Sequence, residues 1–150
     1  MPADATGAAR LFFAVFPPTS LQRELHEALA DVAPSFPGLR WTRAEALHLT
    51  LRFLGDVPRD AIPALVQQVE PIGPAIAPFP VRVEGFGVFP SSRNARVLWL
   101  GVTEGANTLG ALARRLNQAL SEAGWPQSDK PFQAHLTVGR WRERASLPAG

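Results

Sequence analysis

Two of the three histidines in this chain are followed by the same two residues, leucine and then threonine. The motifs are His48-Leu49-Thr50 and His135-Leu136-Thr137, and the third histidine, His26, has no such neighbours. An imidazole can take up or release a proton near neutral pH, and a hydroxyl can hold an anionic oxygen. The repeated pair therefore indicates a site that combines acid–base chemistry with anion binding.

Both motifs lie in apolar runs of strand length, and we expect strands over residues 47–54 and 132–140. Side chains alternate between the two faces of a strand. Each histidine then shares a face with its threonine, while the leucine between them points into the core. Two such strands facing one another would place two imidazoles and two hydroxyls around one cleft.

Two arginines are candidates to join this cleft. Alternation sets Arg52 on the same face as His48 and Thr50. Arg140 falls on the face opposite His135, so it needs a β-bulge or the end of the strand to reach the site.

These groups suit in-line attack on a phosphodiester. One neutral imidazole takes a proton from water while the other, protonated, gives a proton to the leaving oxygen. Threonine hydroxyls and an arginine stabilise the anionic oxygens between them. The spacing of the motifs does not fix which histidine is the acid and which the base. No metal is required.

Other interpretations of the histidines are less favoured. A lone histidine is often a core residue. A role in the core does not explain, however, why two histidines are followed by the same two residues. A catalytic zinc ion is usually bound by three protein ligands, and the chain has no cysteine and no H-x-x-x-H spacing. The G-x-S-x-G elbow of a serine nucleophile, the P-loop and the dinucleotide glycine motif are also absent. We therefore predict no metal and no nucleotide cofactor, and we expect His26 to be a solvated surface residue.

The length and composition are typical of one globular domain. The chain has 150 residues, of which 46% are hydrophobic and 19% charged. It has no cysteine, no apolar stretch long enough to span a membrane, and no signal-peptide pattern at its start, so we expect a cytoplasmic protein. The net charge of +2 does not by itself indicate a nucleic-acid partner, although Lys130 is the single lysine and the other basic residues are arginines.

The pattern along the chain is α+β, with two halves of similar order. Further strands are expected over residues 10–16 (buried), 39–42, 81–89 and 96–102. Helices are expected to begin with a cap at Thr19 or Ser20, near Asp60, and with a cap at Asn107. The proline-rich residues 71–80 form the best internal boundary, and each half ends in one histidine strand. This order suggests a weak internal duplication.

Four stretches of the chain resemble the 2H phosphoesterase superfamily. They are RLFFAVFPP, LRWTRAEALHLTLRFLGDV, VEGFGVFPSSRNARVLWLGV and KPFQAHLTVGR. More closely, they resemble the RNA 2′,3′-cyclic phosphodiesterases, long labelled 2′-5′ RNA ligases. The resemblance implies a bilobal α+β domain over residues 1–150, with pseudo-two-fold symmetry, two antiparallel sheets, helices on the outer faces and a cleft between the lobes. Lobe one would cover about 10–72 and lobe two about 79–145, and the C-terminal part of the family fold is expected to be missing.

The resemblance also implies the activity and the role of each site residue. The reaction is hydrolysis of an RNA or nucleotide 2′,3′-cyclic phosphate to a 2′-phosphate without metal or nucleotide cofactor. His48 maps to the proton donor and His135 to the proton acceptor. Thr50 and Thr137 map to phosphate-binding hydroxyls, and we add Arg52 and Arg140 as phosphate-binding residues. The expected partner is RNA or a nucleotide that carries the cyclic phosphate, with no membrane, no obligate protein partner and a monomeric state.

Two alternatives remain at this point. The first is 2′-5′ RNA ligation, in which a 5′-hydroxyl attacks the cyclic phosphate in place of water. Water at ~55 M favours hydrolysis unless the RNA ends are held at high effective molarity. The second is a non-catalytic module that binds a nucleotide or an RNA phosphate. The two histidines disfavour it, since arginine or lysine would serve binding equally well.

Overall fold

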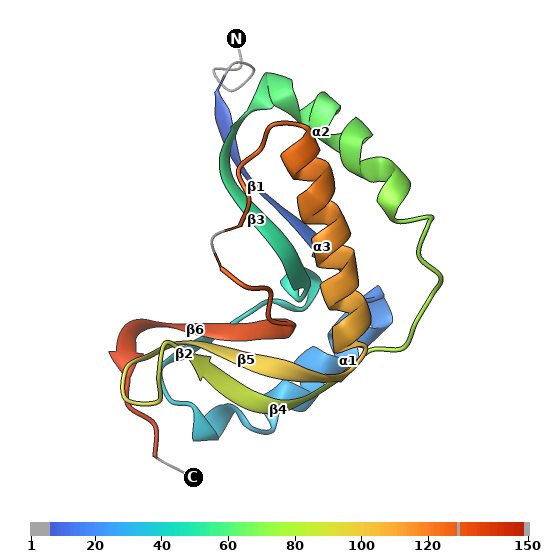
Figure 1. The fold of residues 1–150 in the computed structure, drawn as a ribbon. Helices are drawn as coiled ribbons and strands as arrows, with labels where there is room; N and C mark the ends of the chain where they lie inside the picture. The colour runs from blue at the N-terminus through green and yellow to red at the C-terminus, as the bar shows by residue number, and fades with distance from the viewer. Residues whose placement is uncertain (1–6, 129, 149–150) are drawn as a thin grey trace. The chain divides into compact units, whose positions relative to one another are not determined.

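The computed structural model describes residues 7–128 and 130–148, and its fold is α+β as predicted. The strands are β1 (Ala8–Val15), β2 (Leu39–Trp41), β3 (Leu49–Pro58), β4 (Arg82–Phe89), β5 (Ala95–Glu104) and β6 (His135–Ala145), and the helices are α1 (Thr19–Ala30), α2 (Ile62–Val69) and α3 (Ala106–Glu122) (Figure 1). Among the described residues, no helix has the length and apolar character needed to span a membrane. Residues 1–6, part of the stretch from which we predicted no signal peptide, lie outside the described residues.

The chain divides into two compact units that are interleaved in sequence. Unit 1 is Met1–Ala14, Thr50–Val81 and Glu104–Ala134, and unit 2 is Val15–Leu49, Arg82–Thr103 and His135–Gly150. These units do not coincide with the predicted halves, residues 10–72 and 79–145, because each unit takes its residues from three separate segments. The predicted linker, residues 71–80, belongs to unit 1, and the chain passes into unit 2 after Val81.

Unit 1 pairs β1 with β3 and packs α2 and α3 against them. Its core is an apolar cluster of Val57, Leu65, Leu116 and Leu120, joined by partly buried side chains from both strands, including Leu11 of β1 and Leu51 of β3. The prediction that the first strand is buried throughout is wrong. Phe12 is 40% exposed and stacks on Phe53, which is 53% exposed, because the helices cover only one face of these strands.

Unit 2 is built around β6, which has neighbours on both edges. β5 pairs with one edge in antiparallel fashion, and β2 pairs with the other through Leu39↔Trp141 and Trp41↔Gly139. Leu49, the first residue of β3, also pairs with β6, opposite Leu136. The buried side chains of this unit include Leu29, Leu39, Leu47, Leu49, Leu98, Leu100, Leu136 and Val138. The second histidine strand therefore lies in the interior of the pairing, although it begins at His135 and not at the predicted residue 132.

The two predicted helix caps are wrong. Pro18 is the N-cap of α1 and no side chain caps this helix, so neither Thr19 nor Ser20 has the predicted role. Gly105 is the N-cap of α3, where its φ of 89° and its carbonyl, which accepts the Leu109 N–H, fit a glycine better than Asn107. In both cases the backbone itself begins the helix, without the side-chain cap that the sequence suggested.

Gln22 of α1 is a polar residue, yet it is only 5% exposed. Its side-chain amide donates to the carbonyl oxygen of Leu47 at 2.9 Å and to that of Glu45 at 3.4 Å. A buried amide is tolerated when its hydrogen bonds are made. Gln22 thereby ties α1 to the segment that leads into His48.

Gly87 of β4 lets the indole of Trp99 lie directly on the backbone of the neighbouring strand. A Cβ at Gly87 would lie 2.2 Å from two carbons of the Trp99 ring, which no real structure accommodates without movement. Trp99 in turn packs against Phe89, with ring centroids 5.1 Å apart. The absence of a side chain at this position is thus a packing requirement.

We predict that Gly87→Ala lowers the free energy of unfolding by about 1–3 kcal/mol, because the added methyl overpacks a rigid indole. Gly73→Ala is the matched control, since a Cβ there meets nothing within 4 Å. Urea unfolding of both variants measures the difference. Equal stability of the two variants would contradict this account of Gly87.

Candidate functional site

The two histidine motifs come together through one backbone pairing in unit 2, Leu49 opposite Leu136. These leucines are 6% and 1% exposed, so both point into the core. Because side chains alternate along a strand, His48 and His135 lie on the other face, and Thr137 lies there with them. Continuing the register by one residue sets His48 across from Thr137. His135 is then the diagonal neighbour of His48, and residues in such a diagonal pair are typically about 7–8 Å apart.

One hydrogen bond orients the His48 ring. Its Nδ1 lies 2.6 Å from the carbonyl oxygen of Ala46. A carbonyl can only accept, so Nδ1 carries a hydrogen, and Nε2 is the nitrogen at which this imidazole exchanges its proton. The ring also packs against Phe16, with centroids 5.1 Å apart. His48 is half-buried and held in one orientation, as a general acid or base requires.

Aromatic side chains hold the His135 ring. Phe89 meets it edge to face with centroids 5.2 Å apart, and Trp99 lies 6.0 Å away. Trp99 is the β5 partner of Thr137, so the strand register itself brings the indole next to this motif. Its buried Nε1 has no hydrogen-bond partner in the part of the chain that the structure describes. The sequence alone did not identify Trp99 as a neighbour of this motif.

A β-bulge brings Arg140 to the face of His135. In the β5–β6 pairing, Val97 lies opposite Arg140 and Trp99 lies opposite Thr137. The interval is two residues long in β5 and three in β6, so β6 has one extra residue there. Val97 and Trp99 share a face, and their partners Arg140 and Thr137 therefore share it too. The bulge that the sequence required is present and Arg140 is exposed, while its phosphate-binding role stays a prediction.

Arg52 lies elsewhere in the structure, within unit 1. It is 7% exposed, and its guanidinium donates to Oδ1 of Asn117 on α3 and to the carbonyl oxygen of Pro126. Its Nε donates to the carbonyl oxygen of Phe53 at 3.3 Å. These bonds tie β3 to the C-terminal end of α3. The observed role of Arg52 is structural, and the predicted contact with phosphate stays a prediction.

Thr50 follows Leu49 directly and is the first residue of its segment in unit 1, half-buried. Its phosphate-binding role also stays a prediction. His26 is exposed on α1, as predicted for the histidine without a motif. Within residues 7–128 and 130–148, no three His, Cys, Asp or Glu side chains are grouped closely enough to hold a metal ion.

Comparison with known proteins identifies the same family at the level of sequence. The family model described as LigT like Phosphoesterase matches residues 15–99. The RNA 2′,3′-cyclic phosphodiesterase of Aquifex aeolicus is 32% identical over 132 residues, which cover 87% of this chain and 70% of the relative. The protein of the same name from Thermus thermophilus is 36% identical over 140 residues, covering 87% and 68%.

Solved structures are similar over nearly the whole chain. TT0787 of Thermus thermophilus matches with a TM-score of 0.76 and 33% identity, covering 95% of this chain and 77% of that one. LigT of E. coli in complex with 3′-AMP matches with a TM-score of 0.71 and 31% identity, with the same coverage.

We predict that Arg52→Met lowers the free energy of unfolding by about 2–3 kcal/mol, because a side chain of similar length leaves the Asn117 and Pro126 oxygens without their charged donor. Arg59→Met, at an exposed position of the same unit, is expected to change stability by less than about 0.5 kcal/mol. Denaturant titration compares the two variants. If they lose the same stability, the hydrogen bonds of Arg52 do not support the unit.

Proposed function

Because this chain belongs to the LigT-like phosphoesterase family, within the 2H phosphoesterase superfamily, we propose that it hydrolyses 2′,3′-cyclic phosphates of RNA or nucleotides to 2′-phosphates. The observation that supports this most directly is the Leu49↔Leu136 pairing, from which both histidines follow on one face of unit 2. The name of the Thermus thermophilus relative states the same substrate, and the E. coli relative was solved with a nucleotide bound.

In the proposed reaction, water attacks the phosphorus in line with the 3′ oxygen. His135 accepts a proton from the water as the new P–O bond forms. The bond from phosphorus to the 3′ oxygen breaks, and His48 donates the proton that makes this oxygen a hydroxyl. The hydrogen bond from Nδ1 to Ala46 supports Nε2 as the donating nitrogen. The products are a 2′-phosphate and a 3′-hydroxyl, and the two histidines end with exchanged protonation states.

The negative charge on the non-bridging oxygens needs hydrogen-bond donors in the transition state. Thr50 and Thr137 supply hydroxyls in this proposal, and Arg140 supplies a guanidinium that can bind two oxygens at once. Arg52 is the least suited of the predicted residues, since its guanidinium already binds Asn117 and Pro126.

We also infer the setting in which the enzyme acts. The chain works as a monomer in the cytoplasm, without a metal, a nucleotide cofactor or an obligate protein partner. The lack of cysteine fits a reducing compartment. Sedimentation equilibrium at the mass of one chain is the expected result for the monomer.

We predict that His48→Ala and His135→Ala each reduce turnover of adenosine 2′,3′-cyclic phosphate by about 10²–10⁴-fold, since each removes one proton-transfer group. Phosphorus NMR with a chelator present follows the appearance of the 2′-phosphate. The pH–rate profile of the wild type is expected to be bell-shaped, because one imidazole must be neutral and the other protonated. Affinity for 2′-AMP should stay within about tenfold in both variants.

The matched control is His26→Ala, which removes the exposed histidine of α1 and should turn over substrate like the wild type. Retained activity in either motif variant contradicts the two-histidine mechanism. A 3′-phosphate product would mean that the 2′ oxygen, and not the 3′ oxygen, is the leaving group. Joined RNA ends would favour ligation. Binding of 2′-AMP without turnover by the wild type would favour the non-catalytic module.

A further inference from the structure

Two arginines lie directly opposite one another in the β2–β6 pairing of unit 2. The register places Arg40 across from Arg140. Residues paired in this way point to the same face of a sheet, with Cβ atoms about 4.5–5.5 Å apart. Both arginines are exposed. We call this pair the arginine row.

The arginine row lies on the face that carries the histidine motifs. Arg140 shares this face with Thr137 because of the bulge in β6, so Arg40 lies there as well. The partners of Thr137 and Arg140 on β5 are Trp99 and Val97, and this two-residue interval corresponds to about 7 Å along the strand. All of these residues belong to unit 2. The arginine row is therefore the next row of side chains beyond Thr137, at a separation that long side chains can span.

Arg40 and His48 lie along the same edge of β6. The backbone N–H of Thr42 donates to the carbonyl oxygen of Val138 at 2.9 Å, so the chain follows this edge beyond the end of β2. The segment that contains His48 then returns to the same edge through the pairing of Leu49. One edge of β6 thus presents a guanidinium and an imidazole on one face, in neighbouring rows.

The charge of the arginine row is not compensated by the protein. Within residues 7–128 and 130–148, neither guanidinium has an ion pair or a side-chain hydrogen bond. Arg43, by contrast, pairs with Glu45 at 3.4 Å. Like charges directly opposite one another destabilise a sheet. Folding alone therefore does not favour this pair of cations, and an anionic ligand between them would remove their repulsion.

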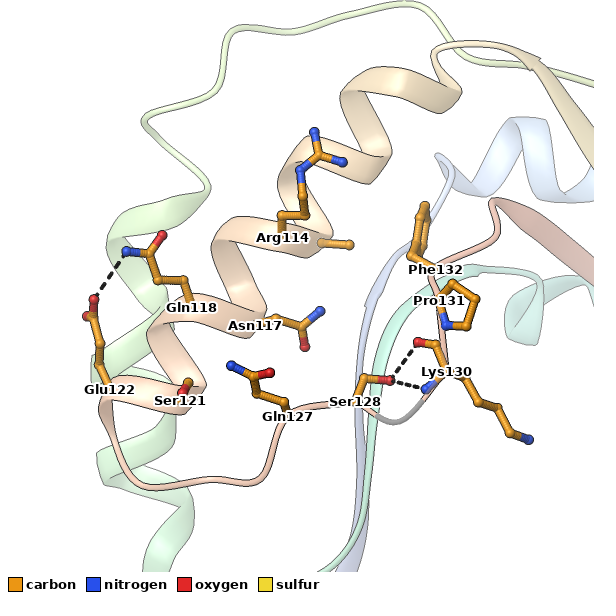
Figure 2. Close-up of a pocket in the computed structure, with 11 residues that line it drawn as sticks. Arg114, Asn117, Gln118, Ser121, Glu122, Gln127, Ser128, Lys130, Pro131 and Phe132 are labelled. Carbon is orange, nitrogen blue, oxygen red and sulfur yellow. Dashed lines mark hydrogen bonds between the residues drawn. The ribbon is translucent and has the colours of Figure 1, made fainter.

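The basic residues of unit 1 have a different setting. Arg114 and Lys130 line a cavity of about 410 Å³ beside α3, and Glu122 lines it with them (Figure 2). Figure 2 also shows the hydrogen bond of 3.3 Å that the side-chain amide of Gln118 donates to Glu122. That lining includes a carboxylate of its own, whereas the arginine row consists of cations alone. The arginine row is the stronger candidate for an anionic ligand.

We propose that Arg40 is a second phosphate-binding arginine, and that the arginine row binds a phosphate group as a dianion. Each guanidinium offers a planar fork of N–H donors that matches two phosphate oxygens. A cyclic phosphate diester carries one negative charge, whereas a phosphate monoester carries nearly two at neutral pH. The row therefore favours the charge that develops as water attacks, and the 2′-phosphate product, over the bound cyclic substrate. This inference rests on the proposed function and adds to it that the product inhibits the enzyme.

Two variants of Arg40 and a matched control test the arginine row. Arg40→Gln removes one charge, and Arg40→Lys keeps the charge without the planar fork. Arg43→Gln is the control, since it removes an exposed arginine whose charge Glu45 already compensates. Isothermal titration calorimetry gives the dissociation constant of 2′-AMP without any turnover. Steady-state kinetics gives KM for adenosine 2′,3′-cyclic phosphate and the inhibition by 2′-AMP, and thermal unfolding gives Tm with and without inorganic phosphate.

We expect Arg40→Gln to weaken binding of 2′-AMP, and inhibition by it, about tenfold, with KM for the cyclic substrate changed by less than about threefold. Arg40→Lys should fall between this variant and the wild type, and Arg43→Gln should match the wild type. Without phosphate, the Tm of Arg40→Gln should equal or exceed that of the wild type, because the variant lacks the repulsion between like charges. Inorganic phosphate should raise the Tm of the wild type more than that of Arg40→Gln.

Unchanged affinity for 2′-AMP in Arg40→Gln would overturn the inference and leave the proposed function intact. An equal loss in Arg43→Gln would also overturn it, because the effect would then follow the net charge. A lower Tm of Arg40→Gln without phosphate would assign Arg40 a structural role instead. If the wild type binds 2′-AMP through Arg40 but hydrolyses no cyclic phosphate, the proposed function fails and the arginine row stands. A wild type that does not bind 2′-AMP contradicts both.

Discussion

The pairing of Leu49 with Leu136 is the constraint on which the whole site depends. Both leucines are buried, so the core fixes the register of the two motifs. A slip by one residue would turn every side chain to the opposite face, placing the imidazoles in the core and the leucines in solvent. The hydrophobic effect that stabilises unit 2 therefore also sets the positions of His48 and His135.

Around this pairing, each histidine is held by a different kind of contact. His48 is fixed by a hydrogen bond to Ala46 and by the ring of Phe16, whereas His135 is packed against Phe89 and Trp99. The second arrangement depends on the strand register and on the space that a glycine leaves for the indole. Apolar packing thus contributes to the orientation of the His135 imidazole.

The sequence predicts the strands, the helices and the two motifs because these follow from local periodicity. The sequence also predicts that Arg140 needs a β-bulge or the end of the strand to reach the face of His135, and the structure contains such a bulge. The roles of Arg52 and Gln22 were not predictable, since their partners are 65 and 25 residues away in sequence. The compact units combine segments that are far apart in sequence, and alternation does not reveal this because it reports a face and not the segment that will cover it. Trp99 was missed because only the cross-strand register places it beside His135.

The measurement that tests the shared site most directly is an NMR titration of the three histidine side chains with 2′-AMP. If both motifs bind one phosphate, the imidazole signals of His48 and His135 shift together, with a single dissociation constant and one equivalent of ligand, and His26 does not respond. Different dissociation constants for the two rings, or a shift of one ring alone, would contradict a single site made from both motifs.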